Sequence, residues 1–191
     1  LRDRLVDVGY APQEGYWSAR FEPAAPGLYT FAHHSARVMS YAPERSIKSA
    51  KAHFVATTSL DRPQAENPGF DNPLGHELEL VAVANPVTPM GPGVPIRVRL
   101  LYKGKPLAGE RVSFIPRGAV LKSGVDDRYE YTTDANGEAA VEPTEAEHYL
   151  VAAHKTESGE GGVLDGKPYQ FTKYSATLTV LPVSLRVTWM S

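Results

Sequence analysis

The chain contains no cysteine among its 191 residues. Disulfides, thiolate metal sites and thiol nucleophiles are therefore excluded together. No segment approaches the ~18 consecutive apolar residues of a membrane-spanning helix, so we expect a protein that does not span a membrane. The first residues, starting at Leu1, show neither a Met nor an apolar signal core. We therefore expect a processed chain from which an export signal has been removed.

The sequence also has no strong excess of either positive or negative charge. The 20 basic and 22 acidic residues give a net charge of −2, and no basic run stands out. A protein that grips a phosphate backbone needs a concentrated positive surface. Nucleic acid is therefore not an expected partner.

The chain is instead rich in turn formers and in short alternating runs. It contains 16 Gly and 16 Pro alongside 42% apolar residues, a composition typical of a folded, turn-rich protein. The run Ile96–Tyr102 alternates apolar and polar residues, and Asp134–Gly137 has the composition of a tight turn. The sequence predicts an all-β fold of two immunoglobulin- or prealbumin-like β-sandwich units.

The predicted division of the chain depends on one segment without periodicity. Residues 61–74 are rich in Pro, Asn and Asp, as expected of a linker. We expect an N-terminal β unit at 1–60, lacking its first strand, a sandwich at 75–183, and a tail or extra strand at 184–191. Strands are predicted at 16–21, 28–34, 47–57, 77–84, 96–102, 111–116, 128–133, 138–141, 148–155 and 173–181. Residues 47–56 could also form a short helix, because their Ser, Lys and Ala content does not favour a strand strongly. Residues 156–167, rich in Gly and carboxylates, are predicted to form a mobile loop.

Several short motifs recur in an order that resembles one bacterial family. They are Gly15-Tyr16, Pro26-Gly27-Leu28-Tyr29, Ser49–Phe54, Gly75–Leu80, Tyr102–Leu107, Thr133–Gly137 and Tyr174–Leu178. The family is the exported one labelled periplasmic component-like proteins of cobalt or nickel uptake systems. The resemblance implies a periplasmic β protein that works beside a metal-uptake transporter or an outer-membrane receptor.

Three histidines in the first predicted unit are candidate ligands for Ni²⁺ or Co²⁺, since imidazole suits both ions. His33 and His34 are neighbours, and on a regular strand they point to opposite faces. Both reach one ion only where the strand ends or bulges, so one edge histidine and one surface histidine is the simpler interpretation. His53 is the third candidate; it and His76 lie on either side of the linker and could approach each other.

His148 and His154 are second-rank candidates for a metal. At ~3.3 Å per residue they stand roughly 20 Å apart on an unbroken strand, too far to chelate one ion. Each has carboxylates nearby in the sequence, so each could join a mixed site. Two solvated strand ends are the simpler interpretation.

Two further patterns give alternative functions. Glu77 and Glu79 would share a strand face about 6.5–7 Å apart, within the range used in glycoside hydrolysis, although ordinary solvated sheets also carry such pairs. Aromatic residues could form a platform for sugar or peptide: Tyr10, Tyr16, Trp17, Tyr29, Tyr41, Tyr169 and Tyr174.

The leading hypothesis is a non-enzymatic exported binding or accessory protein associated with nickel or cobalt uptake. The main alternative is a structural or adhesive module that binds protein or glycan. A carbohydrate-active enzyme that uses Glu77 and Glu79 is the third hypothesis.

Overall fold

The computed structural model describes residues 5–13, 16–58, 67–87, 94–144 and 146–181. Within these ranges every regular element is a strand, so the predicted all-β class is confirmed. The strands are β1 (Leu5–Ala11), β2 (Tyr16–Phe21), β3 (Gly27–Val38), β4 (Glu44–Ala56), β5 (Leu78–Ala82), β6 (Ile96–Tyr102), β7 (Lys105–Pro106), β8 (Arg111–Pro116), β9 (Glu130–Thr132), β10 (Glu138–Val141), β11 (Tyr149–Glu157), β12 (Gly162–Leu164), β13 (Lys167–Tyr169) and β14 (Phe171–Val180). No helix in the described part of the chain is long and apolar enough to cross a membrane.

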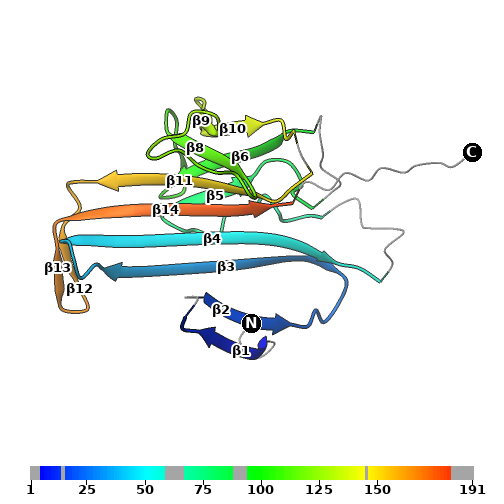
Figure 1. Cartoon of the computed structure of the whole chain (residues 1–191), viewed down its shortest axis with the longest axis horizontal. Coiled ribbons are helices and arrows are strands. Elements are labelled where there is room, and N and C mark those ends of the chain that lie inside the picture. The colour runs from blue at the N-terminus through cyan, green and yellow to red at the C-terminus, as the bar shows by residue number, and fades with distance from the viewer. Residues whose placement is uncertain (1–4, 14–15, 59–66, 88–93, 145, 182–191) are drawn as a thin grey trace, which may run out of the picture.

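The larger sheet has six strands in the order β3-β4-β14-β11-β8-β9. Four of these strands are long and run side by side across the whole molecule (Figure 1). β4 and β14 are parallel, whereas the other neighbours in this sheet are antiparallel. β3 forms one margin of the sheet, and its register with β4 runs from Gly27 to Val38 without a shift.

The smaller sheet has the order β10-β6-β5, with β7 paired to β6. It stacks on one face of the larger sheet around a common core. Leu80, Val98 and Leu100 supply the core side chains of the smaller sheet, and Phe114 and Leu178 face them from the larger one. The Ser49 hydroxyl of β4 donates a buried hydrogen bond of 2.6 Å to the Leu78 carbonyl of β5. This bond joins the two sheets next to the start of β5.

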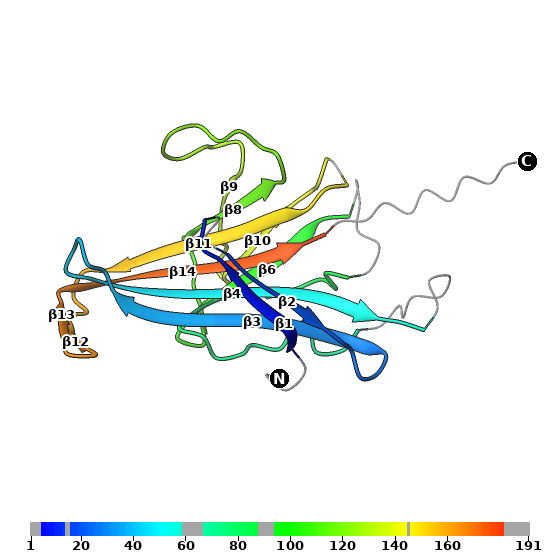
Figure 2. The same cartoon turned by 60° about the horizontal axis from the view of Figure 1, so that its bottom comes forward.

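The β1–β2 hairpin lies across the outer face of the larger sheet, in front of β3 and β4 in Figure 2. Phe21 at the end of β2 meets the rings of Tyr29, Phe31 and Phe54, with centroid distances of 5.4, 5.1 and 6.0 Å. Tyr29 and Phe31 share one face of β3 because side chains alternate along a strand. His34 lies on the opposite face of β3.

The sheet pairing differs from the predicted division of the chain. β3 and β4 come from the predicted unit 1–60, yet β4 pairs along β14 from Glu44 to Ala52. One sheet therefore spans both predicted units. Of the predicted linker 61–74, the structure describes residues 67–74, and the predicted tail 184–191 lies outside the described residues.

One local prediction is wrong and another is confirmed. The segment 156–167 holds the end of β11 and the strand β12, which pairs with β13 across Asp165 and Gly166, both at positive φ. It is therefore mostly a hairpin. The tight turn at Asp134–Gly137 is present, with Asp134 Oδ1 accepting from the backbone N–H groups of Asn136 and Glu138. It connects β9 of the larger sheet to β10 of the smaller one, so it joins two sheets.

Candidate functional site

Three titratable side chains meet where the segment before β5 crosses the margin of the larger sheet. His34 Nε2 of β3 lies 2.8 Å from Glu77 Oε2, and the His34 ring centroid lies 5.3 Å from that of His76. The side chains of His34 and Glu77 are 37% and 39% exposed. We call these three residues the His34 cluster. It is the place where two of the six histidines and a solvent-accessible carboxylate come together.

The shape of the 74–77 segment is set by a buried carboxylate two residues beyond the cluster. Glu79 accepts hydrogen bonds from the backbone N–H groups of Leu74, Gly75 and His76, at 2.6, 2.9 and 3.1 Å. Gly75 has a φ of +84°, a conformation that glycine adopts without steric cost. The segment thus wraps around the Glu79 carboxylate and holds His76 and Glu77 over β3.

Lys51 of β4 completes the environment of Glu79. Its Nζ lies 2.8 Å from Glu79 Oε1, and the two side chains are 3% and 1% exposed. Burial lowers the pKa of Lys51, and the hydrogen bond and charge of Glu79 oppose that shift. Burial alone would raise the pKa of Glu79, but the Leu74 N–H and the Lys51 ammonium outweigh it and lower the pKa. The pair is therefore an ion pair that anchors the segment to β4.

The same environment sets the protonation of the His34 cluster. Burial lowers the pKa of His76, and the carboxylate of Glu79 partly opposes this. Burial would raise the pKa of Glu77, but its hydrogen bonds with a backbone N–H and with His34 lower it. Near neutral pH the cluster accordingly offers a neutral His76 imidazole and an ionised Glu77 carboxylate. These are the forms in which such side chains bind metal ions.

One nitrogen of the cluster lacks a partner. His76 Nδ1 is buried and makes no hydrogen bond, whereas buried polar groups are normally paired. Two imidazoles and one carboxylate form a set that suits Ni²⁺, Co²⁺, Zn²⁺ or Cu²⁺. Within the described ranges, however, no three His, Asp or Glu side chains are arranged to hold an ion as they stand. The His34 cluster is thus an incomplete set of ligands.

The other histidines of the first predicted unit lie elsewhere. His33 is exposed on the face of β3 opposite to His34, as strand alternation predicts. His53 shares the face of His34, since its partner on β3 is Thr30 and that of His34 is Ser49. It is four residues from Ser49 along β4, roughly 13 Å. His53 Nδ1 is 2.9 Å from Thr30 Oγ1, and its Nε2 is buried without a partner.

The second-rank candidates are also separated. His154 is exposed on β11, with Nδ1 3.0 Å from Ser175 Oγ. His148 is exposed just before β11, and its carbonyl accepts the backbone N–H of Arg117. Neither residue has a described carboxylate as a side-chain hydrogen-bond partner. Of the five histidines predicted as metal ligands, His34 alone belongs to the cluster, whereas His76 was named only for its place beside the linker.

The carboxylate pair does not form a site of the predicted kind, and the aromatic side chains that the structure describes, a set without Tyr16 and Trp17, do not share one surface. Glu79 is fully buried and bonded to Lys51 and three N–H groups, so it cannot reach a glycosidic bond. Tyr174 is in the core, whereas Tyr41 is 77% exposed. Tyr29 packs against Phe21 beneath the β1–β2 hairpin. The described tyrosines are thus distributed over several surfaces and the core.

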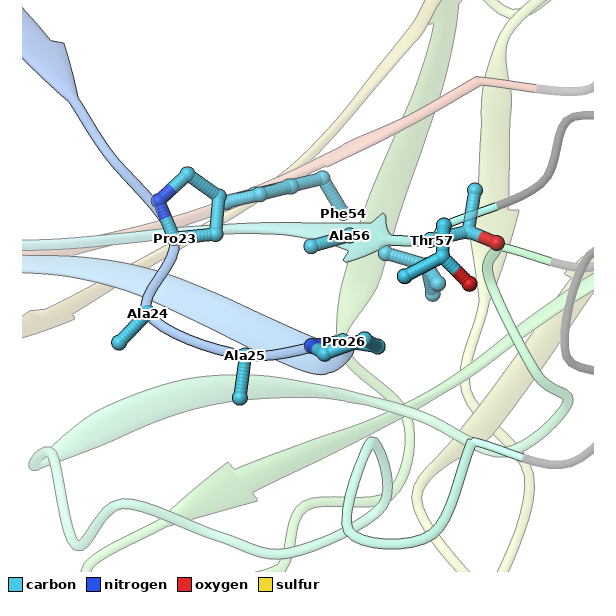
Figure 3. Close-up of a pocket in the computed structure, with 9 residues that line it drawn as sticks. Pro23, Ala24, Ala25, Pro26, Phe54, Ala56 and Thr57 are labelled. Carbon is cyan, nitrogen blue, oxygen red and sulfur yellow. The ribbon is translucent and has the colours of Figure 1, made fainter.

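One depression of the described surface lies apart from the His34 cluster. It has a volume of about 490 Å³ and is lined by Pro23–Pro26 and Phe54–Thr58, next to the end of β4 (Figure 3). Its side chains are apolar or carry a hydroxyl, and none of them titrates. This depression therefore offers shape without an acid, a base or a charged ligand.

A second polar cluster surrounds Glu160 at the far end of the core. Its carboxylate accepts hydrogen bonds from the hydroxyls of Tyr174 and Tyr102 and from Lys103. Burial would raise the pKa of Glu160, but the bonds from Lys103 and Tyr174 lower it. All of these groups are satisfied by one another. The cluster ties the connection between β11 and β12 to both sheets and is a structural element.

The chain is thus an all-β protein in which two sheets share a core and one titratable cluster lies at a sheet margin. A family model described as "Domain of unknown function (DUF4198)" matches residues 2–157. The chain belongs to this family, whose description gives no activity and no link to cobalt or nickel. Comparisons with curated proteins and with solved structures returned no match.

Proposed function

We propose that the protein is a non-enzymatic binding module that captures a divalent transition-metal ion through His34, His76 and Glu77. The observation that carries the proposal is the approach of His34 Nε2 to Glu77 Oε2, 2.8 Å apart, beside the His76 ring. These three side chains come from two segments distant in the sequence. Their approach to one another at a half-exposed sheet margin brings three potential ligands of a metal ion into one place.

Two features of the surroundings support this proposal. The buried Lys51–Glu79 pair holds the 74–77 segment in place, so two ligands are oriented before the ion arrives. His76 Nδ1 is buried without a hydrogen bond, and a bound metal ion would give this nitrogen the partner that it lacks. The depression lined by Pro23–Pro26 and Phe54–Thr58, in contrast, has no titratable side chain and so offers no ligand for an ion.

The biological setting follows from the resemblance described above. We propose a periplasmic location, nickel or cobalt as the ion, and a metal-uptake transporter or outer-membrane receptor as the partner. The stacked sheets fit a prealbumin- or immunoglobulin-like β-sandwich, and we retain that comparison as part of the proposal.

Isothermal titration calorimetry with Ni²⁺ and with Co²⁺ tests the proposal. The parent should bind at least one of them more tightly than millimolar, which corresponds to about −4 kcal/mol. His34→Ala should weaken binding by 10-fold or more, about 1.4 kcal/mol. The matched control His154→Ala removes an exposed strand histidine outside the cluster and should bind as the parent does. Absence of binding to the parent would exclude direct metal capture.

A structural or adhesive module is the second candidate function. It is favoured by the outer margin of β3, which pairs with no strand other than β4 in the described part of the chain and along which another strand can pair. A parent protein that binds neither Ni²⁺ nor Co²⁺ but still associates through β3 would favour this alternative.

A further inference from the structure

The strand that carries His34 is the unpaired margin of the larger sheet. Among the described strands, β3 pairs with β4 and with no other. The opposite margin of the same sheet, β9, has three residues, whereas β3 has 12. A long margin strand presents a row of unpaired backbone N–H and C=O groups, which another strand can use.

The middle of β3 lacks several of the features that normally protect such a margin, and the exposed Arg37 near its end is its one charged side chain other than histidine. Ala32, His33, His34, Ala36 and Arg37 are all exposed. The strand contains no Lys and no Pro, and its register shows no bulge. Lys, Pro and bulges are the usual means of preventing edge-to-edge association. The exposed positions are centred close to His34.

Symmetry restricts how two copies of β3 can pair. Directly opposite residues of an antiparallel pair point to the same face of the sheet. A two-fold axis perpendicular to the sheet also keeps each residue on its own face. Two residues that lie opposite each other are therefore separated by an even number of positions in the sequence. The residue midway between them lies on the two-fold axis, opposite its own copy. If that residue is His34, its Cβ lies roughly 5 Å from the Cβ of its counterpart.

We infer that a second copy of this chain completes the metal site by antiparallel pairing of β3 with β3, with His34 opposite His34. This inference rests on the proposed function. The two His34 imidazoles and the two Glu77 carboxylates then face one ion at the new strand junction. Among the described residues, no three His, Asp or Glu side chains of the single chain are arranged to hold an ion as they stand, and the second copy supplies further ligands.

The side chains that become neighbours are compatible with this pairing. With His34 opposite its own copy, the paired region extends at most from Thr30 to Val38. Ala32 of one copy then lies opposite Ala36 of the other. Arg37 is the one charged residue of β3 other than histidine, and it falls opposite Phe31, on the face away from the ion. No charged side chain meets its like, a contact that would destabilise the pair. The β1–β2 hairpin packs on that other face through Phe21 (Figure 2).

The test combines sedimentation equilibrium with Ni²⁺ titration of the full chain. The inference predicts that Ni²⁺ converts the parent to a species of twice its mass, with one ion per two chains. His34→Ala should raise the dissociation constant of the dimer by at least 10-fold, whereas His154→Ala should leave it unchanged. A parent that binds one ion per chain and stays monomeric would overturn the inference and leave the proposed function standing. A parent that binds no ion would overturn both.

Charge-swap variants test the register. Ala32 and Ala36 are exposed, so substitution there leaves the core intact. A variant with both Ala32→Lys and Ala36→Lys should remain monomeric with Ni²⁺, because two pairs of like charges become opposed. The variant with Ala32→Glu and Ala36→Glu should do the same. An equimolar mixture of the two should dimerise. Dimers of either variant alone, or none in the mixture, would contradict this register.

Discussion

Lys51 and Glu79 form an ion pair across the two sheets, with Nζ 2.8 Å from Oε1 and side chains 3% and 1% exposed. Glu79 also accepts three backbone N–H groups from the segment that precedes β5. One carboxylate thus connects β4, β5 and the segment that carries His76. A change at Glu79 should affect both the stability of the fold and the orientation of the His34 cluster.

Glu79→Gln should lower the free energy of unfolding by about 3 kcal/mol, because breaking a buried pair leaves Lys51 uncompensated. Urea denaturation monitored by circular dichroism measures this loss. Glu22→Gln is the matched control, since Glu22 pairs with Arg20 at 3.5 Å and both side chains are well exposed. Such a surface pair contributes about 0–1 kcal/mol. Equal effects of the two substitutions would show that the buried pair does not anchor the segment.

Two glycines with nearly the same φ separate steric clash from backbone strain. Gly137 has φ +71° and Gly109 has φ +73°. An added Cβ at Gly137 would lie 2.8 Å from the Leu100 carbonyl oxygen and 2.9 Å from the Leu107 nitrogen, whereas at Gly109 it would meet nothing within 4 Å. The strain of positive φ, about 1–2 kcal/mol, applies to both sites.

We therefore expect Gly137→Ala to destabilise the protein more than Gly109→Ala does, by a further 1–3 kcal/mol or so from overpacking. Thermal unfolding of the two variants measures the difference. Similar unfolding temperatures would show that the turn between the two sheets is not packed against β6.

Acidification should destabilise the protein through His53. Burial, with a smaller effect from the charge of Lys51, lowers the pKa of His53 from 6.5 to about 4. The unfolded chain therefore binds a proton at this residue below pH 6.5, and the folded protein does not until about pH 4. Stability falls as pH decreases through this window, by less than the ~3 kcal/mol of the full shift, because solvent screens the partly exposed His53 ring.

Urea midpoints measured from pH 7 to pH 4 test this expectation. His53→Gln removes one titrating group and should reduce the decline between pH 6.5 and 4.5, leaving the part that comes from the lowered pKa of His76. Below that range the lowered pKa values of Glu77 and Glu79 add their own loss of stability as these carboxylates become protonated. A parent and variant with the same slope near pH 5.5 would refute the assignment to His53.

Strand alternation carried most of the fold prediction. Ile96, Val98 and Leu100 are buried along β6, and Arg97 between them is exposed, as the period of two indicates. The pairing of β4 with β14 was not predictable in the same way. Tyr174 lies opposite Ile47, a contact between residues far apart in the chain. Local patterns show that strands exist, whereas the neighbours of a strand depend on how all the faces are buried together.

The candidate site could likewise be predicted only in part, because local patterns give the face of a residue but not its distant neighbours. Alternation placed His33 and His34 on opposite faces, and the structure has them there. The approach of His76 to His34 depends on the stacking of two sheets and on the course of the 74–77 segment. The relevant signal was the adjacency of His76 and Glu77 directly before a strand, after a Gly that permits positive φ. Spacing within one segment cannot identify the distant strand that it faces.

Paramagnetic NMR with Co²⁺ tests the metal-capture claim most directly. Imidazole signals of the histidines are recorded as Co²⁺ is added in substoichiometric steps, because line broadening depends steeply on distance from the ion. Our account predicts that the signals of His34 and His76 broaden first and that those of His148 and His154 persist. First broadening at His33, His53, His148 or His154, with His34 and His76 unchanged, would contradict it.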